Sequence, residues 1–340
     1  MHGQQKYCPS DVTVHQTGNS SNGCHPWIFH SVMDFKGNSL DRYIAGNFQE
    51  KFPNKNPFQE SEARAIYHYT SVDVFERMLH KDADFYLSEC SLLNDDKEFF
   101  TGLELLFKHQ EKSGHDLFWG LDQDYIAKKI KNPSEEPWIM CFSSESDSLG
   151  QWISYTDRQK GGVAIGFDID KLFLSLNHAY ASWRDVDNRY GSLIYLVPCF
   201  YAERDESSIS KLIDFMFGEY REQMLSFYDA EDDIAQHSVT FELILIFSSM
   251  IKHESFHGEK EWRIVFLPHS EDRTAQYQFL GGKPRLKSHM FDDKNMLRDA
   301  IVDVMISPHG SGTRPVASLL KLSGRYSLNP RHSKSPYNGM

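Results

Sequence analysis

The stretch GEKEWRIVF, residues 258–266, predicts a strand in which charged residues stand beside a buried apolar run. Successive side chains of a strand point to opposite faces, so Glu261 and Arg263 share one face and Trp262 takes the other. A carboxylate that enters such a strand needs a partner, which Arg263 or a ligand hydroxyl can supply. The alternative is a solvated strand end with an exposed ion pair, worth about 0–1 kcal/mol. Both interpretations stay open on the residues alone.

A second strand is predicted over YHYTS, residues 67–71, and it carries a histidine. Ile66, His68 and Thr70 share one face of this strand. A histidine and a carboxylate that are far apart in sequence can meet only in the folded sheet, so we take His68 and Glu261 as a candidate catalytic pair. The alternative is a histidine whose ring is satisfied by a backbone partner at a sheet end.

Composition limits the class of protein. The chain has 340 residues, of which 40% are hydrophobic and 14% aromatic, enough for a sizeable core in one large domain or two modest ones. A net charge of −12 argues against a broad phosphate-binding surface but leaves room for a local basic cleft. The sequence shows no signal peptide and no long apolar run, so a cytoplasmic protein without a membrane span is expected. Scattered cysteines predict reduced thiols: Cys8, Cys24, Cys90, Cys141 and Cys199.

The order of predicted elements indicates an α+β fold with a mixed or antiparallel sheet, because regular βαβ alternation is absent. Residues 1–60 are rich in turn-forming residues and are expected to form an irregular N-terminal extension. Residues 61–330 are expected to form a single α+β domain with a helical insertion at about 205–253, followed by a flexible tail at 331–340. Other strands are expected at 84–89, 137–144, 161–170, 192–201, 277–280 and 302–308. Helices are expected at 72–79, after Asn94, at 117–130, over most of 147–160, and twice within 207–253.

A third polar cluster follows the strand that ends in CFSS, residues 141–144. Ser143 lies at this strand end, and Trp152 and Tyr155 are three residues apart on one face of the predicted helix. A core-packing face is the commoner role for aromatic residues at this spacing. The functional alternative is a stacking wall for a flat ligand ring.

Metal-binding motifs are weak in this chain. The two histidines of HESFH, residues 253–257, lack a helical context and a third ligand. Asp95, Asp96 and Glu98 form the compact acidic group, which a helix N-terminus with Asn94 as its cap explains. We therefore expect no metal cofactor.

The order of these motifs resembles a large, poorly characterised family of bacterial cytosolic domains over roughly residues 64–270. Its members show Tyr-x-Tyr-Thr-Ser and Glu-Trp-Arg motifs, with a Trp-x-x-Tyr helix that leads into a Gly-Val-x-Ile-Gly-Phe strand. That family in turn is similar to the ADP-ribosyltransferase superfamily, which implies a split α+β sheet and NAD as substrate. Carried over by motif, His68 with Thr70 matches the first element, and Glu261 matches the final Glu. Tyr155 matches the middle Tyr, and Ser143 the Ser of the alternative class.

The resemblance implies a role for each matched residue. Glu261 would stabilise the oxocarbenium-like ribose of the transition state and hold a ribose hydroxyl. His68 would bind a ribose hydroxyl, and Tyr155 would stack on nicotinamide. Further residues expected around NAD are Tyr69, Thr70, Ser143, Trp152 and Arg263.

The expected function is therefore an NAD-dependent ADP-ribosyltransferase or NAD glycohydrolase, such as a bacterial toxin or anti-phage effector. The macromolecular acceptor is a protein or a nucleic acid, and an antitoxin-like partner is a further expectation. Two alternatives stay open. The first is a non-enzymatic module that binds a nucleotide or a peptide. The second is a metal-dependent nuclease built on Asp95, Asp96 and Glu98.

Overall fold

The computed structural model describes most of the chain between Ala65 and Pro336. The described residues are 65–79, 86–90, 98–130, 137–157, 160–169, 171–172, 193–225, 233–267, 276–280, 283–287, 299–308, 313–322 and 328–336. The expected extension at 1–60 and the expected helix cap at Asn94 lie outside them.

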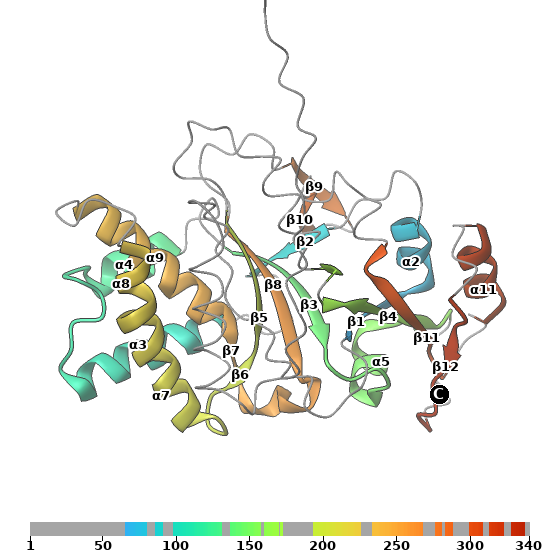
Figure 1. Ribbon diagram of the computed structural model, residues 1–340, viewed down its shortest axis with the longest axis horizontal. Helices are drawn as coiled ribbons and strands as arrows, with labels where there is room; N and C mark the ends of the chain where they lie inside the picture. Colours follow the sequence, from blue (N-terminus) through green and yellow to red (C-terminus); the bar gives the residue numbers. More distant parts are fainter. Residues whose placement is uncertain are drawn as a thin grey trace, which may run out of the picture.

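A ten-stranded mixed sheet forms the centre of the described structure (Figure 1). The strand order is β12-β11-β4-β1-β3-β2-β10-β9, and β8 pairs with both β3 and β5. The pairings are antiparallel, except that β11 and β12 are parallel. The predicted α+β class with a mixed sheet is thereby confirmed. The strands are β1 (Ala65–Ser71), β2 (Tyr86–Glu89), β3 (Trp138–Ser143), β4 (Gly162–Asp168), β5 (Leu193–Pro198), β8 (Glu261–Leu267), β9 (Gln276–Leu280), β10 (Lys283–Lys287), β11 (Ile301–Ile306) and β12 (Arg331–His332).

Continuous burial explains the central strands. Every residue of β8 is buried, and β4 is buried except for its last residue, Asp168. Such strands read as apolar runs because both faces of the sheet are covered. They match the predicted stretches, although β8 begins at Glu261 rather than at Gly258. A 3-10 helix, η4 (Glu254–Glu259), takes the preceding residues.

Helices gather at both ends of the sheet (Figure 1). Helix α2 lies near one end of the sheet with α11, and the predicted helix at 72–79 is confirmed. The opposite end carries a helical lobe, which we define as α3, α4, α7, η3, α8 and α9. The bounds are α2 (Val72–Leu79), α3 (Glu98–Ser113), α4 (Gln123–Ile130), α5 (Leu149–Tyr155), α7 (Glu206–Asp214), the π-helix η3 (Phe215–Tyr220), α8 (Arg221–Leu225), α9 (Asp233–Met250) and α11 (Thr313–Leu322).

The helical lobe packs around α9, whose apolar sequence leaves most of its side chains buried. Gly102 of α3 lies so close to α9 that an added Cβ atom would stand 2.6 Å from the Ser248 Cα atom. The two helices expected within 207–253 are α9 and the continuous run of α7, η3 and α8. A short parallel pair, β6 (Phe200–Tyr201) and β7 (Ile251–Lys252), links this lobe to the sheet.

Two expectations about helix length were wrong. The helix predicted over most of 147–160 is only α5, because Thr156 is extended and its hydroxyl donates to the Trp152 carbonyl at 2.5 Å. The helix predicted at 117–130 begins at Gln123, because a turn occupies 117–120. Asp116 organises that turn by accepting the Gly120 N–H at 2.9 Å.

Part of the expected flexible tail is instead attached to the sheet. Arg331 and His332 form β12 beside β11, and the Arg331 guanidinium pairs with the Asp303 carboxylate. The Lys334 N–H donates to Asp147 at 2.7 Å. Paired charges and backbone donors therefore fix residues 331–336 onto the body.

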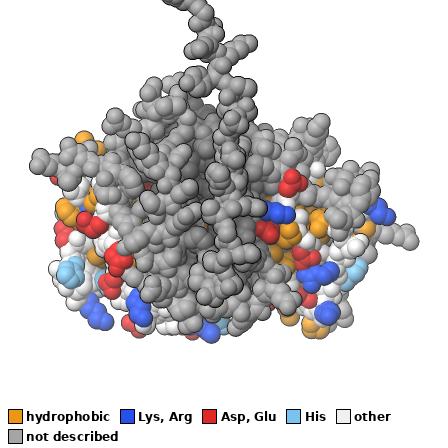
Figure 2. Space-filling view, in the orientation of Figure 1, with side chains coloured by type: hydrophobic (Ala, Val, Ile, Leu, Met, Phe, Trp, Pro, Cys, Tyr) orange, Lys and Arg blue, Asp and Glu red, His pale blue; other side chains and the backbone are white. Residues whose placement is uncertain are grey.

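Acidic and basic side chains are intermixed on the flanks of the face seen in Figure 2, where the described residues show no broad basic patch. Among the described residues, no helix has both the length and the apolar character required to cross a bilayer.

Candidate functional site

Glu261 is the centre of a buried ion network at the start of β8. Its side chain is 3% exposed. The Oε1 atom accepts a hydrogen bond from Arg263 Nε at 2.7 Å, and the Oε2 atom is bound by Lys252 Nζ. The sequence-based alternative of a solvated, exposed Glu–Arg pair is therefore wrong.

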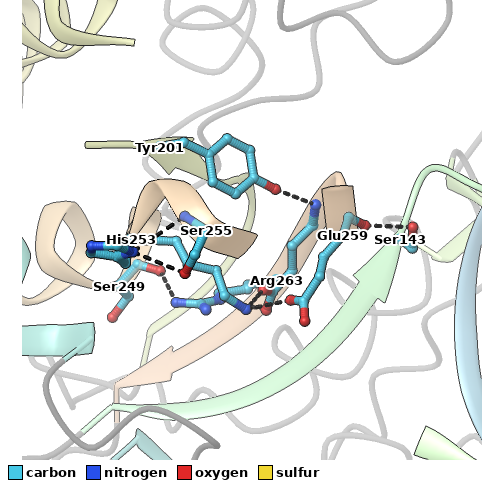
Figure 3. A network of polar contacts seen from close by, with 9 residues as sticks. Ser143, Tyr201, Ser249, His253, Ser255, Glu259 and Arg263 are labelled. Atoms are coloured by element: carbon cyan, nitrogen blue, oxygen red, sulfur yellow. Dashed lines mark hydrogen bonds and ion pairs between the residues drawn. The ribbon is translucent and has the colours of Figure 1, made fainter. Parts of the chain in front are cut away.

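The end of α9 and the short strand β7 that follows it supply the other anchors of this network (Figure 3). Arg263 Nη1 donates to the Ser249 carbonyl at 2.7 Å, and Lys252 Nζ reaches Glu259 Oε2 at 2.5 Å. Two cations thus stand against the carboxylates of Glu259 and Glu261. Lys252 was missed from the sequence. Its signal was a lysine directly after the apolar run of α9.

The neighbouring charges of Arg263 and Lys252 determine whether the Glu261 carboxylate is ionised. Burial alone would raise the pKa of Glu261, but the neighbouring Arg263 and Lys252 outweigh burial and lower that pKa to about 2. Glu261 is therefore ionised at neutral pH. A carboxylate held ionised inside a protein can stabilise positive charge that develops next to it.

Cross-strand pairing places Ser143 beside Glu261. The two residues are directly opposite on β3 and β8, so their side chains share a face. The Ser143 hydroxyl donates to the Glu259 carbonyl at 2.6 Å and accepts the Glu145 N–H at 3.1 Å. Ser143 therefore fixes the turn that leads into Glu261. The backbone N–H of Glu261 donates to the Tyr201 hydroxyl at 2.9 Å.

Tyr155 and Cys141 border the same network. Burial, followed by the charge of Glu259, raises the pKa of Tyr155 above its usual range. Burial, followed by the charge of Glu261, raises the pKa of Cys141 well above its usual range. Both groups are consequently protonated at neutral pH, which makes neither a ready nucleophile.

His68 does not meet Glu261, so the predicted pair is wrong. Tyr67 lies opposite Ser143, which lies opposite Glu261, and these three side chains share one face. His68 follows Tyr67 in β1 and therefore points to the other face. There its ring packs edge-on against Phe142 at 5.8 Å.

The histidine has the backbone partner that the alternative interpretation named. His68 Nδ1 lies 2.9 Å from the Cys141 carbonyl oxygen. Burial lowers the pKa of His68, so the ring is neutral at physiological pH. Thr70 shares the face of His68 and is buried. Neither side chain joins the Glu261 network.

Trp152 and Tyr69 are packing residues rather than a stacking wall. Trp152 is fully buried, its ring stands edge-on to Tyr69 at 4.7 Å, and its Nε1 donates to Asp147 at 2.7 Å. The Tyr69 hydroxyl donates to the Glu145 carbonyl at 2.7 Å and accepts the Ser148 N–H at 2.9 Å. These contacts fix α5 on the sheet and thereby place Tyr155.

The described residues contain no group of three His, Cys, Asp or Glu side chains arranged to hold a metal ion. His253 caps η4, where its Nδ1 accepts the Ser255 N–H at 3.2 Å. The nuclease candidates Asp95, Asp96 and the Glu98 side chain lie outside the described part of the chain.

A comparison with protein families gives a match that covers part of this site. Residues 151–264 match a family described as a protein of unknown function, DUF2971. The matched segment includes Tyr155, Lys252, Glu261 and Arg263, whereas Ser143 precedes it. The expectation of an uncharacterised domain family agrees with this match. No curated protein and no solved structure matches the chain.

Proposed function

We propose that this protein consumes NAD, as an ADP-ribosyltransferase or an NAD glycohydrolase, with Glu261 as its central carboxylate. The observation that carries the proposal is the position of the Glu261 carboxylate, which Arg263 and Lys252 hold on the sheet face shared with Ser143. The motif resemblance supplies the reaction class. His68 and Trp152 have no part in the proposed site.

The chemistry requires a fixed negative charge. When the bond between nicotinamide and ribose breaks, its electron pair leaves with nicotinamide and positive charge develops on the ribose. Glu261 stabilises that charge and accepts a hydrogen bond from a ribose hydroxyl. An acceptor nucleophile, or water, then bonds to the anomeric carbon and loses a proton. Tyr155 stacks on the nicotinamide ring.

Substrate entry requires the network to open. Glu259 is 17% exposed, against 5% for Lys252 and 3% for Glu261. The Glu259 side chain is therefore the one that can move at least cost. Once it leaves, the ammonium group of Lys252 can meet the negative charge of a dinucleotide. The proposed role in a cell is that of a toxin or defence effector, with an antitoxin-like partner to restrain it.

The direct test incubates the purified protein with cell lysate and NAD labelled in its adenylate half. Label on a macromolecule supports transfer, and its sensitivity to protease or nuclease identifies the acceptor. Label in free ADP-ribose supports hydrolysis. Intact NAD, in the presence of folded protein, contradicts the proposal.

A second candidate is a non-enzymatic module that binds a nucleotide or a peptide. The observation that favours it is the closure of the network, in which both oxygens of Glu261 already have cationic partners. This candidate predicts NAD binding without nicotinamide release, unchanged by Glu261→Gln. Release of nicotinamide by the wild type excludes it.

A further inference from the structure

Arg221, in the helical lobe, is a buried cation with a single long ion pair among the described residues. Its side chain is 1% exposed, and its ion-pair partner among the described residues is Glu222, whose Oε1 atom is 3.8 Å from Arg221 Nη1. The Glu222 side chain is itself 72% exposed. Buried charges are normally paired, because removing a charge from water costs several kcal/mol.

Neutral oxygens satisfy only part of this guanidinium. Nε donates to Thr240 Oγ1 at 3.2 Å and Nη2 donates to Gln236 Oε1 at 3.0 Å. Nη1 makes no hydrogen bond to the described residues. A guanidinium has five N–H donors, so the edge formed by Nη1 and Nη2 keeps donors to spare. That edge is the fork that binds carboxylate and phosphate groups through two parallel hydrogen bonds.

Trp119 covers the face of the same guanidinium. The Arg221 Cζ atom lies 4.0 Å from the centre of the indole ring, while Trp119 is 46% exposed. Trp119 also has φ 51°, in the left-handed region that residues other than glycine rarely adopt. The loop thus holds an aromatic ring over a buried cation at the cost of backbone strain, an arrangement typical of functional sites.

The local helix geometry is also unusual. Arg221 directly follows the π-helix η3. π-Helical turns are rare in proteins, and those that occur are often found at functional sites. The charge of Asp116 acts on Arg221, but both Asp116 carboxylate oxygens accept hydrogen bonds from backbone N–H groups, of Phe118 at 3.1 Å and of Gly120 at 2.9 Å.

We propose that Arg221 and Trp119 form a binding site for a small oxyanion, a phosphate or a carboxylate group, in the helical lobe. The fork edge of Arg221 binds two oxygens of the anion, and Trp119 closes over it. This site is separate from the Glu261 network. Thr240 and Ser249, which contact the two sites, are nine residues apart on α9, or about 13 Å at 1.5 Å per residue.

The test titrates the full-length protein with inorganic phosphate at constant ionic strength and follows tryptophan fluorescence. The wild type should show a saturable change that is absent in Trp119→Phe, which removes the reporter. Arg221→Lys keeps the charge but loses the fork, so it should weaken binding by about tenfold or more. The matched control is Arg204→Lys, because Arg204 is exposed in the turn that precedes α7. This variant should bind phosphate as the wild type does. Competition by acetate distinguishes a carboxylate ligand from a phosphate.

Glu222 supplies the deciding variant. If an external anion is the true partner of Arg221, Glu222→Gln removes a competing charge and should tighten phosphate binding. If Glu222 is itself the partner, Glu222→Gln will destabilise the protein without any gain in affinity, and the proposal is overturned. Equal binding by wild type and Arg221→Lys, or no saturable change in the wild type, also overturns it. The Glu222 result stands even if Arg221→Lys fails to fold.

Discussion

Glu261 and Arg263 pair with each other from alternate positions of one strand, with Arg263 Nε 2.7 Å from Glu261 Oε1 and both side chains no more than 3% exposed. Strand alternation itself brings the two side chains to one face. The pair is therefore brought together within β8, and Lys252 of β7, directly after α9, completes it.

Replacing Glu261 by Gln should lower the free energy of unfolding by about 3–5 kcal/mol, because two buried cations lose their shared carboxylate. Urea denaturation measures this change. The double variant Glu261→Gln with Arg263→Met should lose less than the sum of the single changes, since the residues interact directly. A loss below about 1 kcal/mol for Glu261→Gln would contradict the buried network.

Two substitutions of Tyr155 distinguish a role of its ring in stacking from a role of its hydroxyl group. Tyr155→Phe keeps the ring and should retain most NAD turnover, whereas Tyr155→Leu should lose at least about tenfold in kcat/KM, or about 1.4 kcal/mol. Steady-state kinetics with NAD distinguishes the two variants, and circular dichroism checks their fold. Equal turnover of both variants would remove Tyr155 from nicotinamide binding.

Glu242 on α9 should make stability fall with rising pH. Burial raises the pKa of Glu242 from its ordinary value of 4.5 to about 7, with Tyr195 as its hydrogen-bond partner. The folded protein therefore holds a proton that the unfolded chain releases. This contribution is complete below pH 4.5 and is lost as the pH rises to about 7, a fall of up to about 3 kcal/mol.

The matched variant for this effect is Glu242→Gln, which cannot ionise. Denaturant unfolding at pH 5 and pH 8 should show a smaller decrease for the variant than for the wild type, with the variant the more stable at pH 8. Parallel pH profiles for the two proteins would show that Glu242 does not titrate in this window.

The contacts of residues 331–336 should differ in strength. Asp147→Ala should cost about 1–3 kcal/mol, because it leaves the buried Trp152 Nε1 and the Lys334 N–H without their acceptor. Arg331→Ala should cost at most about 1 kcal/mol, because Arg331 is 53% exposed in its pair with Asp303. Thermal unfolding ranks the two variants, and a larger effect of Arg331→Ala would reverse this account.

The sequence was enough to find the strands that carry the site, because β1, β3, β4 and β8 are apolar runs. It could not show which faces meet. The facing depends on the register of β1 against β3. In this register Tyr67, rather than His68, lies opposite Ser143, which in turn lies opposite Glu261. A shift by one residue exchanges the faces, and no local pattern records it.

Other features depended on contacts between distant segments. Lys252 reaches Glu261 only because α9 ends beside β8, and the sequence shows no more than a lysine after an apolar run. The π-turn before Arg221 leaves no periodic signal of its own. Trp152 and Tyr155 were correctly placed on one helix, but only packing shows that Trp152 is buried while Tyr155 borders the Glu261 network.

The most direct measurement is nicotinamide release from NAD by wild type, Glu261→Gln and Glu259→Gln, each at equal concentration of folded protein. Both variants remove one carboxylate from Lys252, but only the first removes the proposed catalytic group. The account predicts release by the wild type and by Glu259→Gln, with none above background for Glu261→Gln. Undiminished release by folded Glu261→Gln, or no release by the wild type, would contradict it.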